Sequence, residues 1–197
     1  MGRPGTLRII AGAVGGIRLA YPKEIRIRPT ADRVREAIFN ILLDRVQDAR
    51  VLDLFAGTGA FGIEALSRGA AECTFVENHR ACIASIRENL RKTGFAERAR
   101  LIAASAFAFP GERARIQQPF DLIFIDPPYH LSQDCAPSSK IAQLVARLSG
   151  PALLAPGGII ILEHASNANV PDELGPAKCV DHRQYGSTGV SFFSGNR

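Results

Sequence analysis

Two spacings of apolar residues alternate along this chain, and together they predict a fold in which strands and helices alternate. Short apolar runs that suit buried strands cover residues 51–54, 73–77, 100–103, 120–125, 159–163, 179–185 and 190–193. Apolar residues recur at helical spacing in the segments 60–68, 80–92 and 139–148. Only Gly186-Ser187-Thr188-Gly189 separates the last two runs, which predicts an antiparallel hairpin. The order predicts an α/β fold with a seven-stranded, mostly parallel sheet, helices on both faces and a C-terminal hairpin.

The N-terminal part of the chain departs from this alternation. Residues 7–28 mix short apolar segments with glycines, which is typical of a β-hairpin or small ribbon. Thr30 or Asp32 can then cap a helix, because apolar residues follow at helical spacing. We therefore expect a hairpin extension over residues 1–30 and one larger domain over residues 31–197.

Composition limits the class of protein. A chain of 197 residues with 46% hydrophobic content can bury one sizeable core. The four cysteines contain no CxxC pair, which argues against a metal site or a disulfide framework and suits reduced thiols in a cytoplasm. No stretch approaches the roughly 18 apolar residues of a membrane helix. We expect a cytoplasmic monomer without metal or membrane attachment.

The positive charge of the chain is concentrated at its N-terminus. Residues 1–50 hold ten Lys or Arg against five Asp or Glu, whereas residues 51–197 hold fourteen of each, so the first quarter carries the whole net charge of +5. Its basic residues, set among apolar ones, include Arg3, Arg8, Arg18, Lys23, Arg26, Arg28, Arg33 and Arg35. Such an extension can contact phosphate backbones. We favour nucleic-acid binding over a surface charge that only maintains solubility.

The segment Asp126-Pro127-Pro128-Tyr129 is the first candidate for chemistry. It directly follows the apolar run 120–125, so a carboxylate, two prolines and an aromatic ring stand at the end of a buried strand. Proline fixes its own φ and restricts the preceding residue, which makes this loop stiff. In open α/β sheets ligands bind at that end of the strands. The groups suit a planar, hydrogen-bond-donating substrate such as the amine of an exposed nucleobase.

A glycine loop between the first predicted strand and the next helix is the second candidate. Gly57, Gly59 and Gly62 satisfy G-x-G-x-x-G, and Glu77 follows at the distance of a ribose-binding acid, so a dinucleotide-dependent dehydrogenase is one interpretation. Asp53 favours S-adenosylmethionine instead, because its carboxylate can pair with the cofactor ammonium and would repel a pyrophosphate. A glycine loop that serves packing alone is the third alternative.

These motifs resemble those of a known family. The segment 53–59, Asp-Leu-Phe-Ala-Gly-Thr-Gly, resembles motif I of class I S-adenosylmethionine-dependent methyltransferases, which have a Rossmann-like fold. Asp126-Pro127-Pro128-Tyr129 resembles the (D/N)PP(Y/F) motif of amino-group methyltransferases. Arg8-Ile9-Ile10-Ala11-Gly12 and the segment 28–36 resemble the bacterial RsmD-type methyltransferases, which modify guanine N2 in small-subunit (16S) ribosomal RNA. The resemblance extends from about Arg8 to Phe193.

The resemblance implies a role for each matching residue. The implied cofactor-binding residues are Asp53, Phe55, Gly57, Gly59, Glu77, Asn78, Ser105, Ala106 and Asp126. Many methyltransferases have an acid where this chain has Ser105, so Ser105 or backbone groups would bind the adenine. The implied catalytic residues are Asp126, Pro127 and Tyr129: two acceptors for the target amine and a ring that stacks on the base. The implied RNA-binding residues are Arg8, Arg18, Arg28, Thr30 and Arg33.

We therefore expect methyl transfer from S-adenosylmethionine to a guanine N2 of small-subunit ribosomal RNA, as naked RNA or as an assembling subunit. A DNA adenine-N6 methyltransferase is an alternative, although such enzymes usually carry an added recognition domain. Protein glutamine methylation is another, although Asn normally heads its motif. An RNA-binding assembly protein without catalytic activity is the alternative from a different class.

Overall fold

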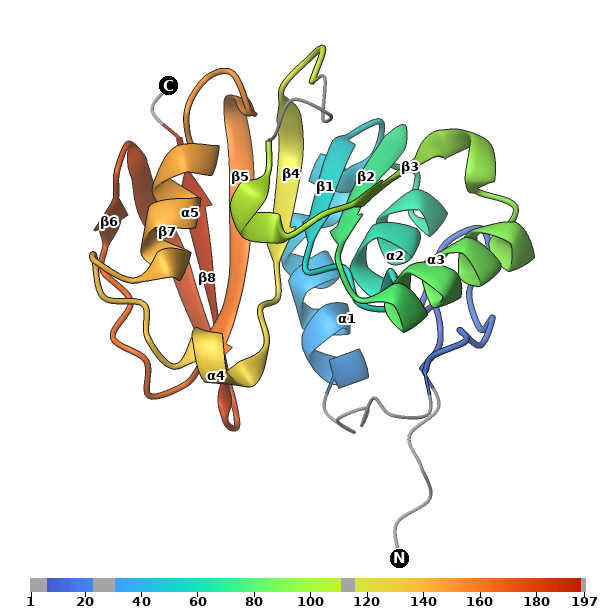
Figure 1. The fold of residues 1–197 in the computed structure, drawn as a ribbon, viewed down its shortest axis with the longest axis horizontal. Helices are drawn as coiled ribbons and strands as arrows, with labels where there is room; N and C mark the ends of the chain where they lie inside the picture. The colour runs from blue at the N-terminus through green and yellow to red at the C-terminus, as the bar shows by residue number, and fades with distance from the viewer. Residues whose placement is uncertain (1–6, 23–30, 111–115, 196–197) are drawn as a thin grey trace, which may run out of the picture. The chain divides into compact units, whose positions relative to one another are not determined.

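The computed structural model describes residues 7–22, 31–110 and 116–195. The chain divides into two compact units, Met1–Ala104 and Ser105–Arg197. Each unit contributes its own strands and helices (Figure 1).

The first unit contains three parallel strands in the order β3-β2-β1. Its elements are α1 (Ala31–Leu42), η1 (Leu43–Val46), β1 (Arg50–Leu54), α2 (Ala60–Ser67), β2 (Glu72–Glu77), α3 (Arg80–Thr93), η2 (Ala96–Arg98) and β3 (Ala99–Ala103). Leu54 pairs with Val76, and Glu77 pairs with Ala103, so the three strands end at one edge. The loops that follow β1, β2 and β3 therefore share that edge.

Helix α2 packs closely on β1 and β2 (Figure 1). A Cβ atom at Gly62 would lie 2.3 Å from the Phe75 ring and 2.5 Å from Cys73 Sγ, so only glycine allows this approach. Ile63 and Leu66 of the same helix are buried. The third glycine of the G-x-G-x-x-G pattern thus serves helix–strand packing.

Residues 7–20 form a hairpin, with one isolated bridge between Arg8 and Arg18 in place of regular strands. Ile9 N donates to Ile17 O at 2.9 Å, and Leu19 N donates to Leu7 O at 2.9 Å. Leu7, Ile9 and Leu19 are buried, whereas Arg8 and Arg18 are exposed. The hairpin therefore has an apolar inner side and a basic outer side.

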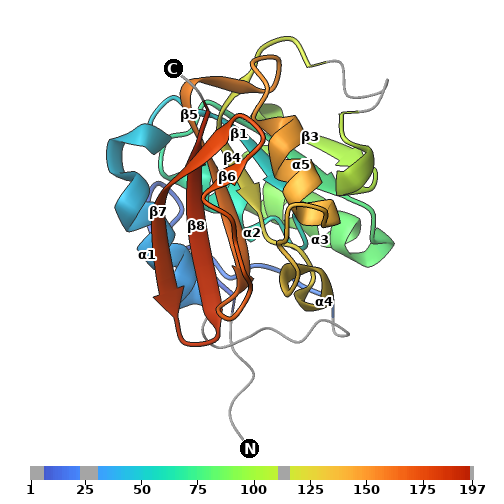
Figure 2. The same cartoon turned by 90° about the vertical axis from the view of Figure 1, so that its left-hand side faces the viewer.

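The second unit contains strands in the order β4-β5-β8-β7-β6. Its elements are η3 (Ala106–Ala108), β4 (Phe120–Ile125), α4 (Tyr129–Ser132), α5 (Lys140–Leu148), β5 (Leu154–Ala165), β6 (Glu173–Leu174), β7 (Ala177–Tyr185) and β8 (Thr188–Ser194). Strands β4 and β5 are parallel, and the other neighbours are antiparallel. Figure 2 shows β7 and β8 as a long twisted hairpin.

The predicted α/β class, with parallel strands followed by a C-terminal antiparallel hairpin, is confirmed, although the strands form a mixed sheet and not a mostly parallel one. The predicted count of seven strands is wrong, since the described residues contain eight. The additional strand, β6, has only two residues, too few to show a period of two in the sequence. None of the helices in the described part of the chain is long and apolar enough to cross a membrane.

Candidate active site

The glycine loop between β1 and α2 has an unusual backbone conformation. Phe55, Gly57 and Gly59 all have positive φ angles of 57°, 55° and 80°. Gly59 N donates to Ala56 O at 2.7 Å, and Ala56 N donates to Val76 O at 3.2 Å. A phenylalanine in the left-handed region costs about 1–2 kcal/mol. Such strain persists only where surrounding contacts fix the loop, and it is common at ligand sites.

Asp53 bonds to the helix that follows this loop. It lies in β1 with 2% of its surface exposed, and its Oδ2 accepts a hydrogen bond of 3.0 Å from Gly62 N. Gly62 lies in the first turn of α2, where a negative charge is favourable. Asp53 therefore orients the start of α2 as well as placing a buried negative charge behind the glycine loop.

Glu77 joins the glycine loop to the end of β2. Its Oε2 accepts from Gly57 N at 2.8 Å, and its Oε1 accepts from Asn78 N at 2.8 Å and His79 N at 2.7 Å. A carboxylate can accept about four hydrogen bonds, so these three leave capacity for a hydroxyl group. Asn78 is exposed beside it.

The glycine loop fits a cofactor that approaches bare backbone. A Cβ atom placed on Gly57 would meet no atom closer than Phe55 O at 3.9 Å. That side of the loop is therefore open, and the nearby acceptor Glu77 suits the ribose hydroxyls of S-adenosylmethionine. Among the predicted cofactor residues, Asp53, Phe55, Gly57, Gly59, Glu77 and Asn78 lie on this loop or on the ends of β1 and β2.

Ser105 and Ala106 belong to the second unit. Ser105 precedes η3, and its carbonyl accepts from Ala108 N at 3.0 Å. Ala106 is buried in η3, which the sequence did not predict. Ser105 is partly exposed.

The Asp126–Tyr129 segment leaves β4 and enters a short helix. Asp126 is half-buried, Pro127 is buried, and Pro128 forms the N-terminal cap of α4. Tyr129 is the first residue of α4, a helix that the sequence did not predict, and 57% of its surface is exposed. Its carbonyl accepts from Ser132 Oγ at 2.9 Å. The backbone of Tyr129 is thus fixed while its ring remains available for stacking.

Two of the predicted RNA-binding residues lie side by side. Arg8 and Arg18 are bridge partners in the hairpin, and cross-strand partners project on the same face. Like charges placed opposite each other are destabilising, so an anion between or beside them would be stabilising. Arg33 is exposed on α1. Arg28 and Thr30 lie outside the described residues.

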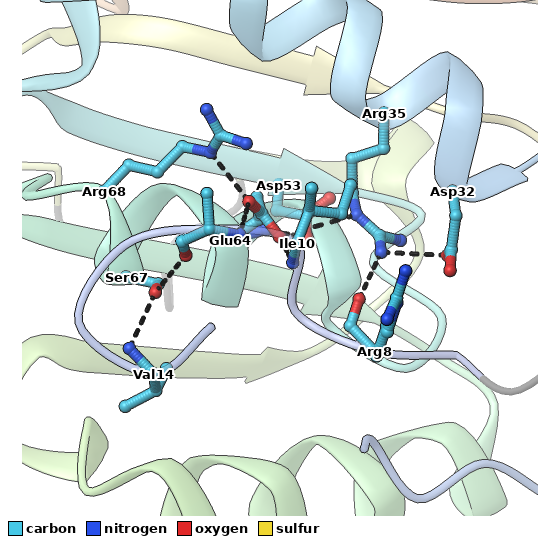
Figure 3. A network of polar contacts seen from close by, with 11 residues as sticks. Arg8, Ile10, Val14, Asp32, Arg35, Asp53, Glu64, Ser67 and Arg68 are labelled. Atoms are coloured by element: carbon cyan, nitrogen blue, oxygen red, sulfur yellow. Dashed lines mark hydrogen bonds and ion pairs between the residues drawn. The ribbon is translucent and has the colours of Figure 1, made fainter. Parts of the chain in front are cut away.

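Arg35 is an exception among the N-terminal basic residues that we predicted to contact phosphates. It is 2% exposed, and its Nη2 donates to Arg8 O at 2.6 Å and to Asp32 Oδ1 at 3.0 Å (Figure 3). Its Nε lies 3.8 Å from Glu64 Oε2. Burial lowers the pKa of the Arg35 guanidinium, although the charges of Asp32 and Glu64 oppose that shift. Arg35 therefore fastens the hairpin to the fold, and its buried guanidinium is not available to bind a phosphate.

Two side chains of α2 that hold the hairpin were not predicted from the sequence. The fully buried Glu64 of α2 accepts from Ile10 N at 2.7 Å and from Ala11 N at 3.1 Å (Figure 3). Ser67 Oγ donates to Ala11 O at 2.6 Å and accepts from Val14 N at 3.1 Å. A glutamate in the middle of helix 60–67, whose other residues before Ser67 are apolar or glycine, was the available signal, because buried acids require partners.

The four cysteines are free thiols, three of them buried and Cys179 partly buried. Burial raises the pKa of Cys73 well above its ordinary value, and it raises the pKa of Cys82 and of Cys135 to about 11. Burial also raises the pKa of Cys179. At neutral pH these groups are thiols, which are poor nucleophiles. Within the described ranges, no three His, Cys, Asp or Glu side chains are grouped so that they could hold a metal ion.

Comparison with known proteins identifies the family. The family model Cons_hypoth95, "Conserved hypothetical protein 95", matches residues 7–194. The Bacillus subtilis (strain 168) protein named "Putative rRNA methyltransferase YlbH" is 32% identical over 187 residues, which are 95% of this chain and 98% of that protein. Escherichia coli (strain K12) "Ribosomal RNA small subunit methyltransferase D" is 42% identical over 125 residues, 64% of this chain and 61% of that protein.

A solved structure agrees with these sequence matches over almost the whole chain. The structure described as "Putative methyltransferase yhhF from Escherichia coli" superposes with a TM-score of 0.77 and 32% identity, covering 98% of this chain and 99% of that one. The match includes both the glycine-loop unit and the unit with the Asp126–Tyr129 segment. The predicted resemblance is thereby confirmed: the chain belongs to the RsmD/YlbH (Cons_hypoth95) family of S-adenosylmethionine-dependent methyltransferases.

Proposed function

We propose that this protein transfers a methyl group from S-adenosylmethionine to the exocyclic N2 amine of a guanine in small-subunit ribosomal RNA. The Asp126–Tyr129 segment carries the proposal, because it combines a half-buried carboxylate with an exposed aromatic ring at the end of β4. The 42% identity to a small-subunit ribosomal RNA methyltransferase supports the choice of substrate.

The first unit would hold the cofactor. When bound, S-adenosylmethionine supplies an electrophilic methyl group on a positively charged sulfur. Glu77 would accept hydrogen bonds from the ribose hydroxyls, and Gly57 and Gly59 would let the cofactor lie against the backbone. Asp53 would contribute negative charge near the methionine end and fix α2 through Gly62. Asn78 and Phe55 would border the ribose and the loop.

The Asp126–Tyr129 segment would hold the acceptor base. Asp126 and the Pro127 carbonyl would accept hydrogen bonds from the guanine amine, and Tyr129 would stack on the ring. An amine conjugated to its ring is a weak nucleophile, and two acceptors draw its nitrogen towards tetrahedral geometry. This help is orientation and electrostatic stabilisation. The amine loses its own proton after transfer, so no covalent enzyme adduct is required, which agrees with the protonated thiols.

The substrate must present an unpaired or flipped base. Flipping a paired base costs a few kcal/mol, whereas RNA loops expose bases at little cost. Residues 1–30 and α1 would bind the surrounding phosphates. The exposed side chains of Arg8, Arg18 and Arg33 are the candidates for these contacts. Arg28 and Thr30 are also predicted to contact the RNA.

The test is a panel of methyl acceptors. Labelled S-adenosylmethionine is incubated with the protein and with unmethylated small ribosomal subunits, naked small-subunit RNA, DNA or release factors, and labelled products are digested for mass spectrometry. We expect N2-methylguanosine from one of the first two acceptors. Label in DNA alone would instead support an adenine methyltransferase, and label in release factors alone a glutamine methyltransferase. No transfer to any acceptor, with RNA still bound, would support an assembly protein.

A further inference from the structure

Asn89 of α3 connects the N-terminal hairpin with the glycine loop. Its Oδ1 accepts from Ala20 N at 2.7 Å, and its Nδ2 donates to Ala20 O at 2.9 Å. The same Nδ2 donates to Thr58 O at 3.0 Å. Asn89 is fully buried in the structure. One amide group therefore bonds at once to the end of the hairpin and to the middle residue of Gly57-Thr58-Gly59.

The chemistry of this site allows only asparagine. Both amide hydrogens and the carbonyl oxygen of Asn89 are used, and an amide turned by 180° would face each partner with the wrong group. Aspartate would keep the bond to Ala20 N but would place a carboxylate oxygen against two carbonyls. A buried carbonyl without a donor is costly. The contacts of Asn89 are thus more specific than those of a side chain that merely fills space.

The bond to Thr58 O fixes one peptide plane of the glycine loop. The N–H of the same peptide belongs to Gly59, which donates to Ala56 O at 2.7 Å. Asn89 and Ala56 therefore hold the two ends of this plane. Gly59 precedes the first turn of α2 with φ of 80°, so a rotation of the plane would shift both the loop and the start of α2.

The bond to Ala20 holds the other partner, the hairpin. Ala20 directly follows Leu19, which pairs with Leu7. Lys92, three residues beyond Asn89 in α3, donates from Nζ to Arg18 O at 2.5 Å. Helix α3 therefore forms hydrogen bonds with the segment of the hairpin that contains the exposed Arg18.

From these contacts we infer that Asn89 is a positioning residue that couples the basic hairpin to the glycine loop. A displacement of the hairpin on binding RNA would change the Thr58–Gly59 peptide, and cofactor binding would in turn restrict the hairpin, because such linkage is reciprocal. The loop half of this inference, that Asn89 orients the glycine loop for the cofactor, does not require an RNA substrate. The hairpin half rests on the proposed function.

The test compares Asn89→Asp with Ser67→Ala. Ser67 also fastens the hairpin, through hydrogen bonds to Ala11, Ala13 and Val14, and none of these residues belongs to the glycine loop. Calorimetry measures the dissociation constant of S-adenosylmethionine with and without small-subunit RNA, and thermal denaturation records the stability of each variant. We expect Asn89→Asp to weaken cofactor binding about tenfold, the equivalent of one buried hydrogen bond. Ser67→Ala should change it less than about twofold at a comparable loss of thermal stability.

The RNA measurements complete the test. In the wild type, RNA should tighten cofactor binding about fivefold or more. The ratio of cofactor dissociation constants without and with RNA should stay the same in Ser67→Ala and fall to about one in Asn89→Asp. Equal weakening of cofactor binding in both variants would overturn the loop half, and a wild-type factor of one with RNA bound would overturn the coupling. If no RNA were bound or methylated while the cofactor-binding difference persisted, the proposed function would fail and the loop half would stand.

Discussion

The glycine loop and the Asp126–Tyr129 segment, the proposed sites for cofactor and substrate, are built in opposite ways. In the glycine loop the polar groups are already engaged: Glu77 accepts three amide bonds, and Asp53 is 2% exposed. In the Asp126–Tyr129 segment the backbone is fixed by proline and a short helix, while the Tyr129 ring is 57% exposed. The proposed cofactor site is thus already organised by its own hydrogen bonds, whereas the proposed substrate site presents an exposed ring.

The difference has a physical reason. A cofactor of constant shape can be bound by a rigid loop, which avoids an ordering cost on binding. An aromatic platform tolerates different approaches of a base, because stacking depends little on sequence. We therefore expect substitutions in the glycine loop to affect cofactor affinity and stability, and substitutions at Asp126 or Tyr129 to affect turnover or RNA binding.

Removing the carboxylate of Asp126 should have the largest effect. Asp126→Ala should lower the turnover of methyl transfer about 10³-fold, the order found for loss of a group that stabilises a transition state. Cofactor affinity measured by calorimetry should stay within a few fold. Asp134→Ala, which removes an exposed carboxylate after α4, is the control. Wild-type turnover in Asp126→Ala would contradict the catalytic assignment.

Glu77→Gln should weaken cofactor binding about 10–100-fold, because hydrogen bonds to a charged group are worth about 1.5–3 kcal/mol. Either orientation of the glutamine would turn an NH₂ group towards a backbone N–H of Gly57, Asn78 or His79. Glu72→Gln, at the exposed start of the same strand, is the matched control. Similar dissociation constants for the two variants in calorimetry would refute the role of Glu77.

Tyr129→Ala should raise the KM for RNA about tenfold, since stacking contributes roughly 1–3 kcal/mol per base. Tyr129→Phe keeps the ring and should stay within about twofold. The dissociation constant of S-adenosylmethionine should not change in either variant. A Phe variant as impaired as the Ala variant would mean that the hydroxyl, and not the ring, is the functional group.

The smallest expected effect is a dependence of stability on pH. It arises from a buried polar cluster of the second unit. In the second unit, His164 Nδ1 lies 2.8 Å from Ala165 O, and Ser191 Oγ lies 3.0 Å from both His164 Nε2 and His182 Nδ1. Burial lowers the pKa of His164, and the nearby His182 adds to that shift. The unfolded chain thus takes up a proton more readily than the folded one.

The free energy of unfolding should therefore fall as pH drops through about 6.5, the ordinary pKa of histidine, and continue to fall until the lowered pKa of folded His164 is reached. Urea denaturation at pH 7.5 and 5.5 measures this difference. His164→Asn should show a smaller one. An unchanged pH dependence in that variant would assign the effect to another group.

The sequence predicted the fold and both candidate loops because their signals are local. Strand β1, the glycines and α2 follow each other within twenty residues, and Pro127 and Pro128 mark the end of β4 unambiguously. The two-residue β6 and the one-turn α4 are too short for a periodic pattern. The role of Gly62 could be read from G-x-G-x-x-G, whereas the strain at Phe55 could not, since only the folded loop imposes its φ of 57°.

The side chains that join segments distant in sequence could not be predicted. Arg35 looked like one more exposed basic residue until the structure placed it against Glu64, 29 positions later in the chain. Asn89 lies 69 residues from Ala20 and 31 from Thr58. No spacing rule connects such positions, because the contacts depend on how α2 and α3 pack on the hairpin.

The way the hairpin is held has a consequence for how this protein can change during evolution. Glu64, Ser67 and Asn89 all bind its main-chain N–H and C=O groups, so they recognise its shape and not its exposed side chains. Gly12 is the exception, since a Cβ atom there would lie 2.0 Å from Ser67 O. Solvent-facing positions such as Arg8 and Arg18 can therefore be replaced without loosening the hairpin. Under the proposed function, a new nucleic-acid preference can arise there in single steps, each one leaving the glycine loop intact.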